Sequence, residues 1–93
     1  MFSVNDYFGG KVKSLGFEST EGKATIGVMA TGEYEFGTST VEHMTVTSGS
    51  MHAMLPGETK WKTYKAFETF IVPKDVKFKV KVEGDTSYRC LYK

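Results

Sequence analysis

The sequence predicts an all-β domain, a two-sheet barrel of the jelly-roll type, on three observations. Turn residues recur roughly every 8–12 residues, which is typical of sandwiches and barrels. The runs between them alternate with a period of two: in the segment 77–82, apolar side chains occupy the even positions and lysines the odd ones. A strand sorts such residues onto two faces, whereas a helix would scatter them. No segment shows helical periodicity.

The alternating runs predict the strands in order along the chain. The segments 33–36 and 44–47 repeat the even-numbered apolar pattern, the second with threonines facing outward. Glycine-, proline- and aspartate-containing turns bound these runs, because such residues accept the backbone angles of tight turns. The expected strands cover residues 11–17, 23–30, 33–38, 43–48, 50–55, 60–64, 67–72, 76–82 and 86–92.

The length and the edges of the sheets constrain the organisation of the chain. Ninety-three residues, 40% of them hydrophobic, bury one core, so residues 1–93 are expected to form a single domain. Many short strands leave unpaired edges, and closure into a barrel removes them. The large outward-facing residues Phe2, Trp61 and Tyr64 predict an exposed aromatic patch that a second copy would cover, giving a homodimer.

Composition excludes several classes of partner. Twelve basic and eleven acidic residues leave a net charge of +1, and the only arginine is Arg89, so nothing points to a nucleic acid polymer. No apolar run approaches the roughly 20 residues that span a bilayer, so no membrane partner is expected. The single Cys90 forms no intramolecular disulfide and no secretory leader is visible, which predicts a cytoplasmic protein.

Two segments resemble the sequence motifs of the cupins. In the segment 42–49, Glu42 is followed by six residues and Gly49, as in the second half of the first cupin motif. The segment 67–73 resembles the second motif, although Phe67 stands where a glycine is usual. The resemblance implies a cupin-like β-barrel.

A closer likeness runs along nearly the whole chain. It rests on glycines, aromatic residues and short motifs in a fixed order: Asn5, Tyr7-Phe8, 10–14, Phe17, 27–29, 32–34, Phe36, Glu42, 44–46, Ser48-Gly49, Leu55-Pro56, Trp61, Tyr64, Val72-Pro73, Ser87-Tyr88 and Cys90. In these features the chain resembles the pyrimidine/purine nucleoside phosphorylases, which are short, single-domain cupins.

The resemblance implies a reaction in which a purine or pyrimidine nucleoside and orthophosphate give the free base and ribose 1-phosphate. Nucleosides and phosphate are then the expected small-molecule partners, with phosphate as a co-substrate. One departure concerns the arginine that the family tends to have after the late cysteine. Leu91 occupies that position, and Arg89 lies two residues earlier, on the same face of a strand.

The positions that hold metal in other cupins do not carry metal ligands here. Counting back from Glu42, the two histidine positions of the metal-binding motif fall on Phe36 and Thr38, and the third falls on Phe78. One carboxylate, two phenyl rings and a hydroxyl do not supply the three or four ligands of a transition metal. We therefore expect neither a metal nor another cofactor.

Glu42 is the main candidate for catalysis. It is expected to point inward beside Met44 and Val46, where burial raises the pKa of a carboxyl. Its side chain either binds ribose hydroxyls and manages a proton at the departing base, or is a structural carboxylate held by backbone N–H groups. His43 faces the opposite side, and His52 has no partner at a recognisable spacing, so both are expected at the surface or the rim.

The candidate substrate-binding residues are aromatic and polar. Aromatic rings stack on any base, which suits broad specificity, although filling the core is the alternative role for each ring. Phosphate needs donors near C1′, and Arg89 can bind it through two parallel hydrogen bonds. Lys11 and Lys13 alternate as on a solvated face, and Cys90 is expected to be buried and unreactive. The candidates are Tyr34, Phe36, Phe78 and Tyr88 for the base, and Arg89, Thr38 and Ser48 for phosphate.

These residues predict phosphorolysis by positioning and electrostatics. The base stacks in the barrel, Arg89 places phosphate beneath the anomeric carbon, and Glu42 stabilises a transition state that resembles an oxocarbenium ion. The alternatives are a metal-free cupin that binds a nucleoside or sugar without turning it over, and a structural dimer module with a packed interior.

Overall fold

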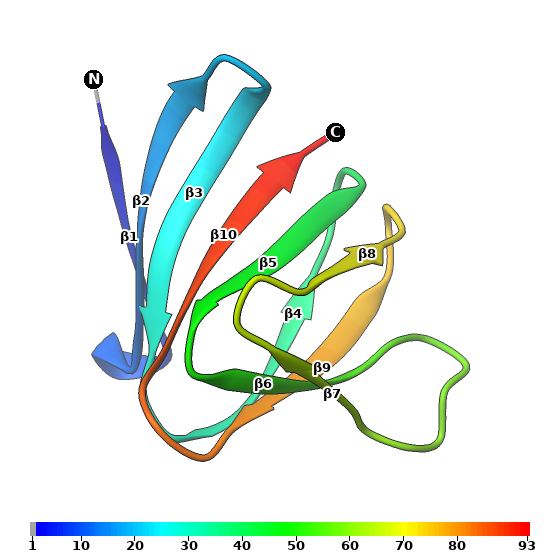
Figure 1. The fold of residues 1–93 in the computed structure, drawn as a ribbon. Coiled ribbons are helices and arrows are strands. Elements are labelled where there is room, and N and C mark those ends of the chain that lie inside the picture. Colours follow the sequence, from blue (N-terminus) through cyan, green and yellow to red (C-terminus); the bar gives the residue numbers. More distant parts are fainter. Residues whose placement is uncertain (1) are drawn as a thin grey trace.

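The computed structural model describes residues 2–93, which form ten strands and one short 3₁₀ segment (Figure 1). The strands agree with the expected ones to within two residues at each end, and β1 is an addition. The elements are β1 (Ser3–Tyr7), η1 (Phe8–Gly10), β2 (Val12–Ser19), β3 (Gly22–Met29), β4 (Gly32–Gly37), β5 (Glu42–Ser48), β6 (Ser50–Met54), β7 (Lys62–Lys65), β8 (Thr69–Val72), β9 (Lys77–Val82) and β10 (Thr86–Tyr92).

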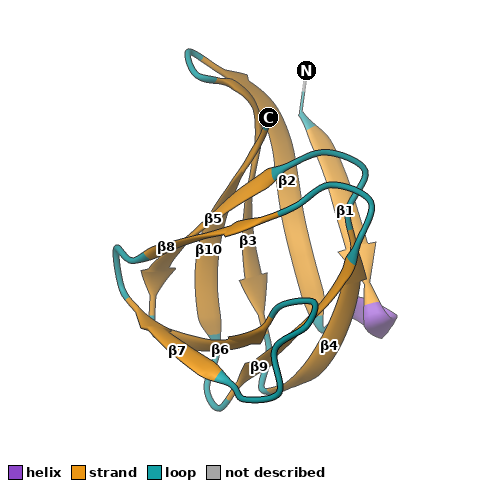
Figure 2. Cartoon of the chain, turned by 90° about the vertical axis from the view of Figure 1, so that its right-hand side faces the viewer, coloured by secondary structure: helices purple, strands orange, loops and turns teal. Residues whose placement is uncertain are grey.

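The strands form two antiparallel sheets that face each other. The larger has the order β1-β2-β3-β10-β5-β8 and the smaller the order β4-β9-β6-β7. Figure 2 shows the smaller sheet lying across from the larger one. This confirms the all-β, two-sheet class. The prediction of a closed barrel is wrong, because the two sheets remain separate hydrogen-bonded units.

Strand pairing confirms the period-two pattern. In the β4–β9 pair, Tyr34 lies opposite Val80 and Phe36 opposite Phe78, and these four side chains face the interior. The alternate positions face outward, where Glu33 lies opposite Lys81. Opposite charges on directly paired positions stabilise a sheet by about 0.2–1 kcal/mol.

The core fills the space between the two inner faces. Met29 from the larger sheet and Met51 from the smaller one are almost fully buried, as are Val12, Val46 and Val80. Burying such a side chain contributes roughly 1.5–3 kcal/mol. Residues 2–93 contain no helix that is long and apolar enough to cross a membrane.

The first strand is the element that the sequence analysis missed. Its sequence lacks the apolar alternation of the other strands, since four of its five residues are exposed. Gly16 of β2 permits the pairing, because a Cβ there would collide with the Ser3 hydroxyl. After β1, the chain turns through Phe8 (φ 53°) and Gly9 (φ 66°). This turn brings Tyr7 and Phe8 against Phe36 of the smaller sheet.

The exposed apolar surface differs from the one predicted. Tyr64 packs on Phe70 with ring centroids 4.6 Å apart, and Trp61 is half-buried beneath the Lys81 ammonium group at 4.7 Å. Of the three residues named from sequence, Phe2 is the one that is largely exposed. The outer face of the larger sheet carries a separate aliphatic patch, which consists of Val4, Leu15, Ile26 and Val28. We call these four residues the aliphatic patch.

Candidate functional site

A cavity of about 670 Å³ lies between the inner faces of the two sheets. Its volume lies within the range of about 300–1,000 Å³ that is usual for small-molecule sites. Strands from both sheets and the η1 turn contribute to it. The lining residues are Asp6, Tyr7, Phe8, Ser14, Met29, Glu35, Phe36, Gly37, Ser39, Glu42, Met44, Phe78, Tyr88, Cys90 and Tyr92.

One wall of the cavity is aromatic. Phe36 packs beside Phe78 with centroids 5.8 Å apart, and the Phe8 ring meets Phe36 edge-on at 5.5 Å. Phe36, Phe78 and Tyr88 line the cavity as predicted. Tyr34 lies behind this wall: its side chain is buried, and its hydroxyl donates a 2.6 Å hydrogen bond to the Ala30 carbonyl.

A glycine positions Tyr88 in this cavity. Tyr88 of β10 pairs with Gly27 of β3, and a Cβ at Gly27 would lie 2.5 Å from the tyrosine hydroxyl and 2.6 Å from a ring carbon. The ring therefore lies across β3 only because residue 27 has no side chain. Burial raises the pKa of Tyr88 to about 12, so the phenol remains a neutral hydrogen-bonding group.

Glu42 points into the cavity from the start of β5. Burial raises the pKa of its carboxyl, and a hydrogen bond from Cys90 partly opposes that effect. The Cys90 sulfur lies 3.5 Å from Glu42 Oε1. The thiol stays protonated, because burial and then the nearby Glu42 charge raise its pKa to about 12. Glu42 is thus a half-buried carboxyl with a raised pKa, next to a thiol that donates to it.

The electrostatics of the cavity are acidic. Among the described residues that line it there is no lysine, arginine or histidine. Asp6 and Glu35 occupy outward strand positions, and Asp6 lies 3.9 Å from the Lys13 ammonium group on the outer side. Glu42 is therefore the carboxylate residue that the strand alternation directs inward. An anion placed in this cavity would find no cationic partner.

The predicted phosphate donors lie elsewhere. Tyr88 and Cys90 point inward, so Arg89 between them faces the outer side of the larger sheet, because neighbouring residues on a strand point to opposite faces. There its guanidinium group lies 3.3 Å from the Glu21 carboxylate. The Thr38 hydroxyl donates to the Pro73 carbonyl at 2.7 Å and accepts from the Val76 N–H at 3.1 Å.

The remaining phosphate-donor candidate, Ser48, and the two lysines considered beside it also lie outside the cavity lining. Ser48 is exposed at the far end of β5. Lys11 and Lys13 are exposed, as expected of a solvated face. The structure thus brings Glu42 together with Phe36, Phe78 and Tyr88, and it separates Glu42 from Arg89, Thr38 and Ser48.

Several lining residues were not named from sequence. Tyr92 lies on the same face as Tyr88 and Cys90, so the period-two rule would have found it. Tyr7 and Phe8 reach the cavity through β1 and the η1 turn, which carried no strand signal. Ser39 belongs to the connection between β4 and β5, where sequence alternation gives no information.

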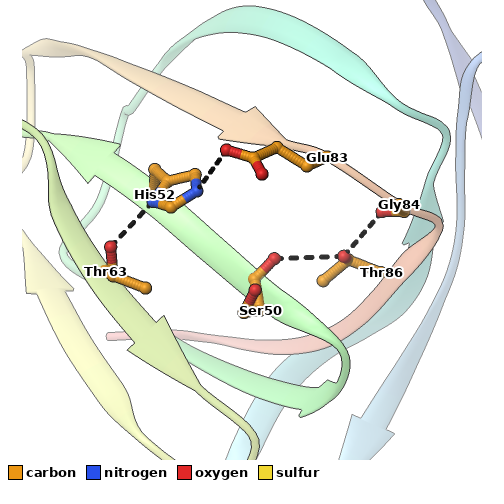
Figure 3. Close-up of polar contacts among 6 residues, drawn as sticks. All are labelled: Ser50, His52, Thr63, Glu83, Gly84 and Thr86. Carbon is orange, nitrogen blue, oxygen red and sulfur yellow. Dashed lines mark hydrogen bonds and ion pairs between the residues drawn. The ribbon is translucent and has the colours of Figure 1, made fainter.

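The two histidines lie away from the cavity. His43 occupies an outward position of β5 opposite Ile71 and Leu91. His52, on the outer face of the smaller sheet, lies between Thr63 and Glu83 (Figure 3), with Nδ1 2.8 Å from the threonine hydroxyl and Nε2 3.1 Å from the carboxylate. This agrees with the surface and rim positions expected from the sequence.

The cupin metal positions do not provide a suitable donor set. They present the rings of Phe36 and Phe78 and the internally hydrogen-bonded Thr38, beside Glu42 and the protonated Cys90 thiol. No group of three or more histidine, cysteine, aspartate or glutamate side chains within residues 2–93 is arranged to hold a metal ion. The residues present at these positions do not fit a transition metal.

Comparison with known proteins matches the chain over its full length. A family model described as pyrimidine/purine nucleoside phosphorylase matches residues 2–92. A protein of that name from Pseudomonas putida (strain W619) is 55% identical over 93 residues, covering 100% of this chain and 99% of the relative. Another of that name, from Alcanivorax borkumensis, is 56% identical over 92 residues, covering 99% of this chain and 98% of the relative.

Solved structures match the fold. A protein of unknown function from Vibrio parahaemolyticus superposes with a TM-score of 0.93 at 41% identity, covering 97% of this chain and 96% of that one. An RmlC-like cupin from Shewanella frigidimarina superposes with a TM-score of 0.75 at 18% identity, covering 97% of this chain and 81% of that one. The second likeness concerns the fold alone.

Proposed function

The chain belongs to the pyrimidine/purine nucleoside phosphorylase family, and we propose that it is a pentosyltransferase of broad specificity. It would convert a purine or pyrimidine nucleoside and orthophosphate into the free base and ribose 1-phosphate. The observation that carries the proposal is the cavity that holds both an aromatic wall and the half-buried carboxyl of Glu42, within a chain that matches the family over its whole length.

Broad specificity follows from how the base would be held. Phe36, Phe78 and Tyr88 offer flat apolar surfaces, and stacking contributes about 1–3 kcal/mol for any base because every base has a π-face. The pyrimidine or purine ring would lie against this wall, and the ribose would extend toward Glu42. A site built on stacking recognises the shape of the ring more than its pattern of hydrogen-bonding groups.

Glu42 would act as the general acid. A phosphate oxygen forms a bond to C1′ while the C1′–N bond breaks, and the bonding electron pair leaves with the base. The base then needs a proton, which the Glu42 carboxyl would supply, since burial raises its pKa above that of an ordinary carboxyl. The carboxylate regains a proton from solvent after the products leave. Every group in this scheme belongs to the protein or the substrates, so the mechanism uses neither a metal nor another cofactor.

One experiment tests the function directly. Purified protein is incubated with uridine or adenosine, with and without phosphate, and the free base and ribose 1-phosphate are quantified. We expect equal amounts of both products, formed only when phosphate is present and unchanged by a metal chelator. Absence of base release in phosphate would overturn the proposed reaction, and loss of activity with the chelator would overturn the metal-free mechanism.

A second function is favoured by the lack of a cationic side chain in the cavity lining. The chain would then bind a nucleoside or sugar without converting it. Calorimetric titration with uridine, run beside the activity assay, separates the two possibilities. Saturable binding with no product in phosphate indicates the binding protein, and product formation indicates the enzyme.

The assembly and location are also part of the proposal. The aliphatic patch leaves Val4, Leu15, Ile26 and Val28 between 48% and 74% exposed on one flat face, so we propose that a second copy covers it in a homodimer. Nothing in the charge balance points to nucleic acid as a partner. The free, buried Cys90 is compatible with the reducing cytoplasm, where we place the protein.

A further inference from the structure

A second cavity, of about 420 Å³, adjoins the first. The two share Ser39 and Tyr92 in their linings, so these residues form the boundary between them. The Tyr92 hydroxyl is fixed there by a 3.1 Å hydrogen bond to Thr25. The second cavity lies at the end of the larger sheet where β1, β2 and β3 meet the connection between β4 and β5.

The lining of this second cavity mixes polar and apolar surface and contains a cation. Most of the lining residues carry a hydroxyl or amide group, and Lys23 adds an ammonium group. Lys23 shares the inner face of β3 with Thr25, since the two residues are separated by two positions. Glu18 lies opposite Lys23 in the β2–β3 register and also lines the cavity, but no ion pair among residues 2–93 includes Lys23. The first cavity has no such cation.

One hydroxyl in the second cavity has no partner within the protein. Thr40 Oγ1 is buried, and it makes no hydrogen bond to any described residue. Buried polar groups are nearly always satisfied, so a group that enters the cavity and reaches this hydroxyl would complete its hydrogen bonding. The neighbouring Asn5 amide is oriented by a 3.2 Å hydrogen bond to the Ser14 hydroxyl. An anion with several acceptor oxygens would satisfy the hydroxyl, the amide and the ammonium group together.

We infer that the second cavity is the phosphate subsite, with Lys23, Thr40 and Asn5 as its principal donors. This rests on the proposed function and adds the location of the co-substrate. Phosphate in the second cavity and the base in the first would meet at the boundary formed by Tyr92 and Ser39. Glu42 lies opposite Tyr92 in the β5–β10 register, so the proposed general acid is also at that boundary.

This arrangement explains why neither cavity alone suffices. The first cavity provides stacking surfaces and an acid but no cation. The second provides a cation and hydroxyl groups, and its aromatic residues are Phe17 and the shared Tyr92. The phosphate oxygen forms its bond to C1′ from one side, and the base leaves toward the aromatic wall on the other.

The experiment measures the two substrates independently. Lys23→Gln and Thr40→Val are compared with Lys79→Gln, a matched loss of charge on the outer face of the smaller sheet. We expect both test variants to raise the KM for phosphate by about tenfold and to leave the KM for uridine within about twofold. Lys23→Arg should retain most of the phosphate affinity. The control should change neither constant.

Direct binding separates this inference from the proposed reaction. Line broadening of the ³¹P signal of inorganic phosphate is titrated with wild type and with Lys23→Gln. Broadening that the substitution removes supports the subsite, even if no turnover is found and the proposed function fails. An active wild type whose Lys23→Gln and Thr40→Val variants keep the original phosphate KM would overturn the subsite while leaving the reaction intact. Thermal melting of each variant checks that the fold is retained.

Discussion

The two faces of the larger sheet have opposite chemistry, although they are built from the same strands. On β10, Tyr88, Cys90 and Tyr92 face the cavity, whereas Arg89 and Leu91 face outward. On β3, Gly27 lies beneath a tyrosine, while the next residue, Val28, belongs to the aliphatic patch. The comparison teaches that one step along a strand separates the cavity lining from the exposed aliphatic patch, and so the proposed site from the proposed dimer face. Single substitutions should therefore disturb one role without the other.

The largest effect is expected on the inner face. Glu42→Gln removes the transferable proton, so kcat should fall by roughly 100-fold or more, in line with the usual contribution of general acid catalysis. In the wild type, activity should decline as pH rises through the raised pKa of Glu42, because the acid loses its proton. That limb of the pH–rate profile should be absent from the variant. Glu33→Gln, at an outward position of β4 and outside the cavity lining, is the control, and an equal loss of activity there would contradict the assignment.

The same carboxyl makes stability depend on pH. A group whose pKa is raised by folding binds more protons in the native state than in the unfolded state, so the free energy of unfolding falls as pH increases. The decline should span the interval between the ordinary carboxyl pKa and the raised one. Chemical denaturation of wild type and Glu42→Gln at several pH values measures it. A wild-type stability that increases across that interval would contradict a raised pKa.

The outer face is expected to control assembly. Ile26→Lys introduces a charge at the centre of the aliphatic patch, next to Leu15 and Arg89 in register. The dissociation constant of the homodimer should rise at least about tenfold, since a buried unpaired charge is costly in an interface. Sedimentation velocity measures the change in the dissociation constant. The kcat at saturating substrate should remain within about twofold of the wild-type value. Glu33→Lys on the solvated face of the smaller sheet is the control, and a wild-type monomer would rule out the interface.

A smaller effect tests a contact within the inner face, between Gly27 and Tyr88. Gly27→Ala should displace Tyr88 and reduce stability by about 1–3 kcal/mol, because a methyl group must enter a filled space. The KM for uridine should rise together with this loss. Gly84→Ala, where a Cβ would meet nothing within 4 Å, is the matched control and should change stability by no more than about 0.5 kcal/mol. A uridine KM that Gly27→Ala leaves unchanged would contradict the role of Tyr88 in binding.

The parts of the fold that the sequence predicted are those governed by strand alternation. The middle and late strands, the inward position of Glu42 and the aromatic wall of Phe36, Phe78 and Tyr88 all follow from a period of two. Arg89 shows where reasoning by resemblance departed from this rule. Alternation alone places it on the face opposite Tyr88.

The remaining features depend on contacts between segments that are distant in sequence. The β1 strand is mostly exposed and forms because β2 offers a free edge, with Gly16 leaving room for Ser3. The second cavity combines β1–β3 with Thr40 from a connecting loop, so no local pattern reveals it. Separation into two sheets is likewise a property of the assembled strands.

The smallest expected effect concerns a residue that lies outside both faces. Phe67 has φ 72° and is 82% exposed in the turn between β7 and β8, at the position where related cupins usually have glycine. A non-glycine residue with a positive φ costs about 1–2 kcal/mol of stability. Glycine avoids this cost but loses about 0.5–1 kcal/mol of the gain, because it makes the unfolded chain more flexible. Phe67→Gly should therefore stabilise the protein by about 0.5–1 kcal/mol in urea denaturation, with activity and dimerisation unchanged. Phe67→Ala removes the same exposed ring but retains the unfavourable backbone angle, so an equal gain from alanine would show that the ring, and not the backbone, is the source of the effect.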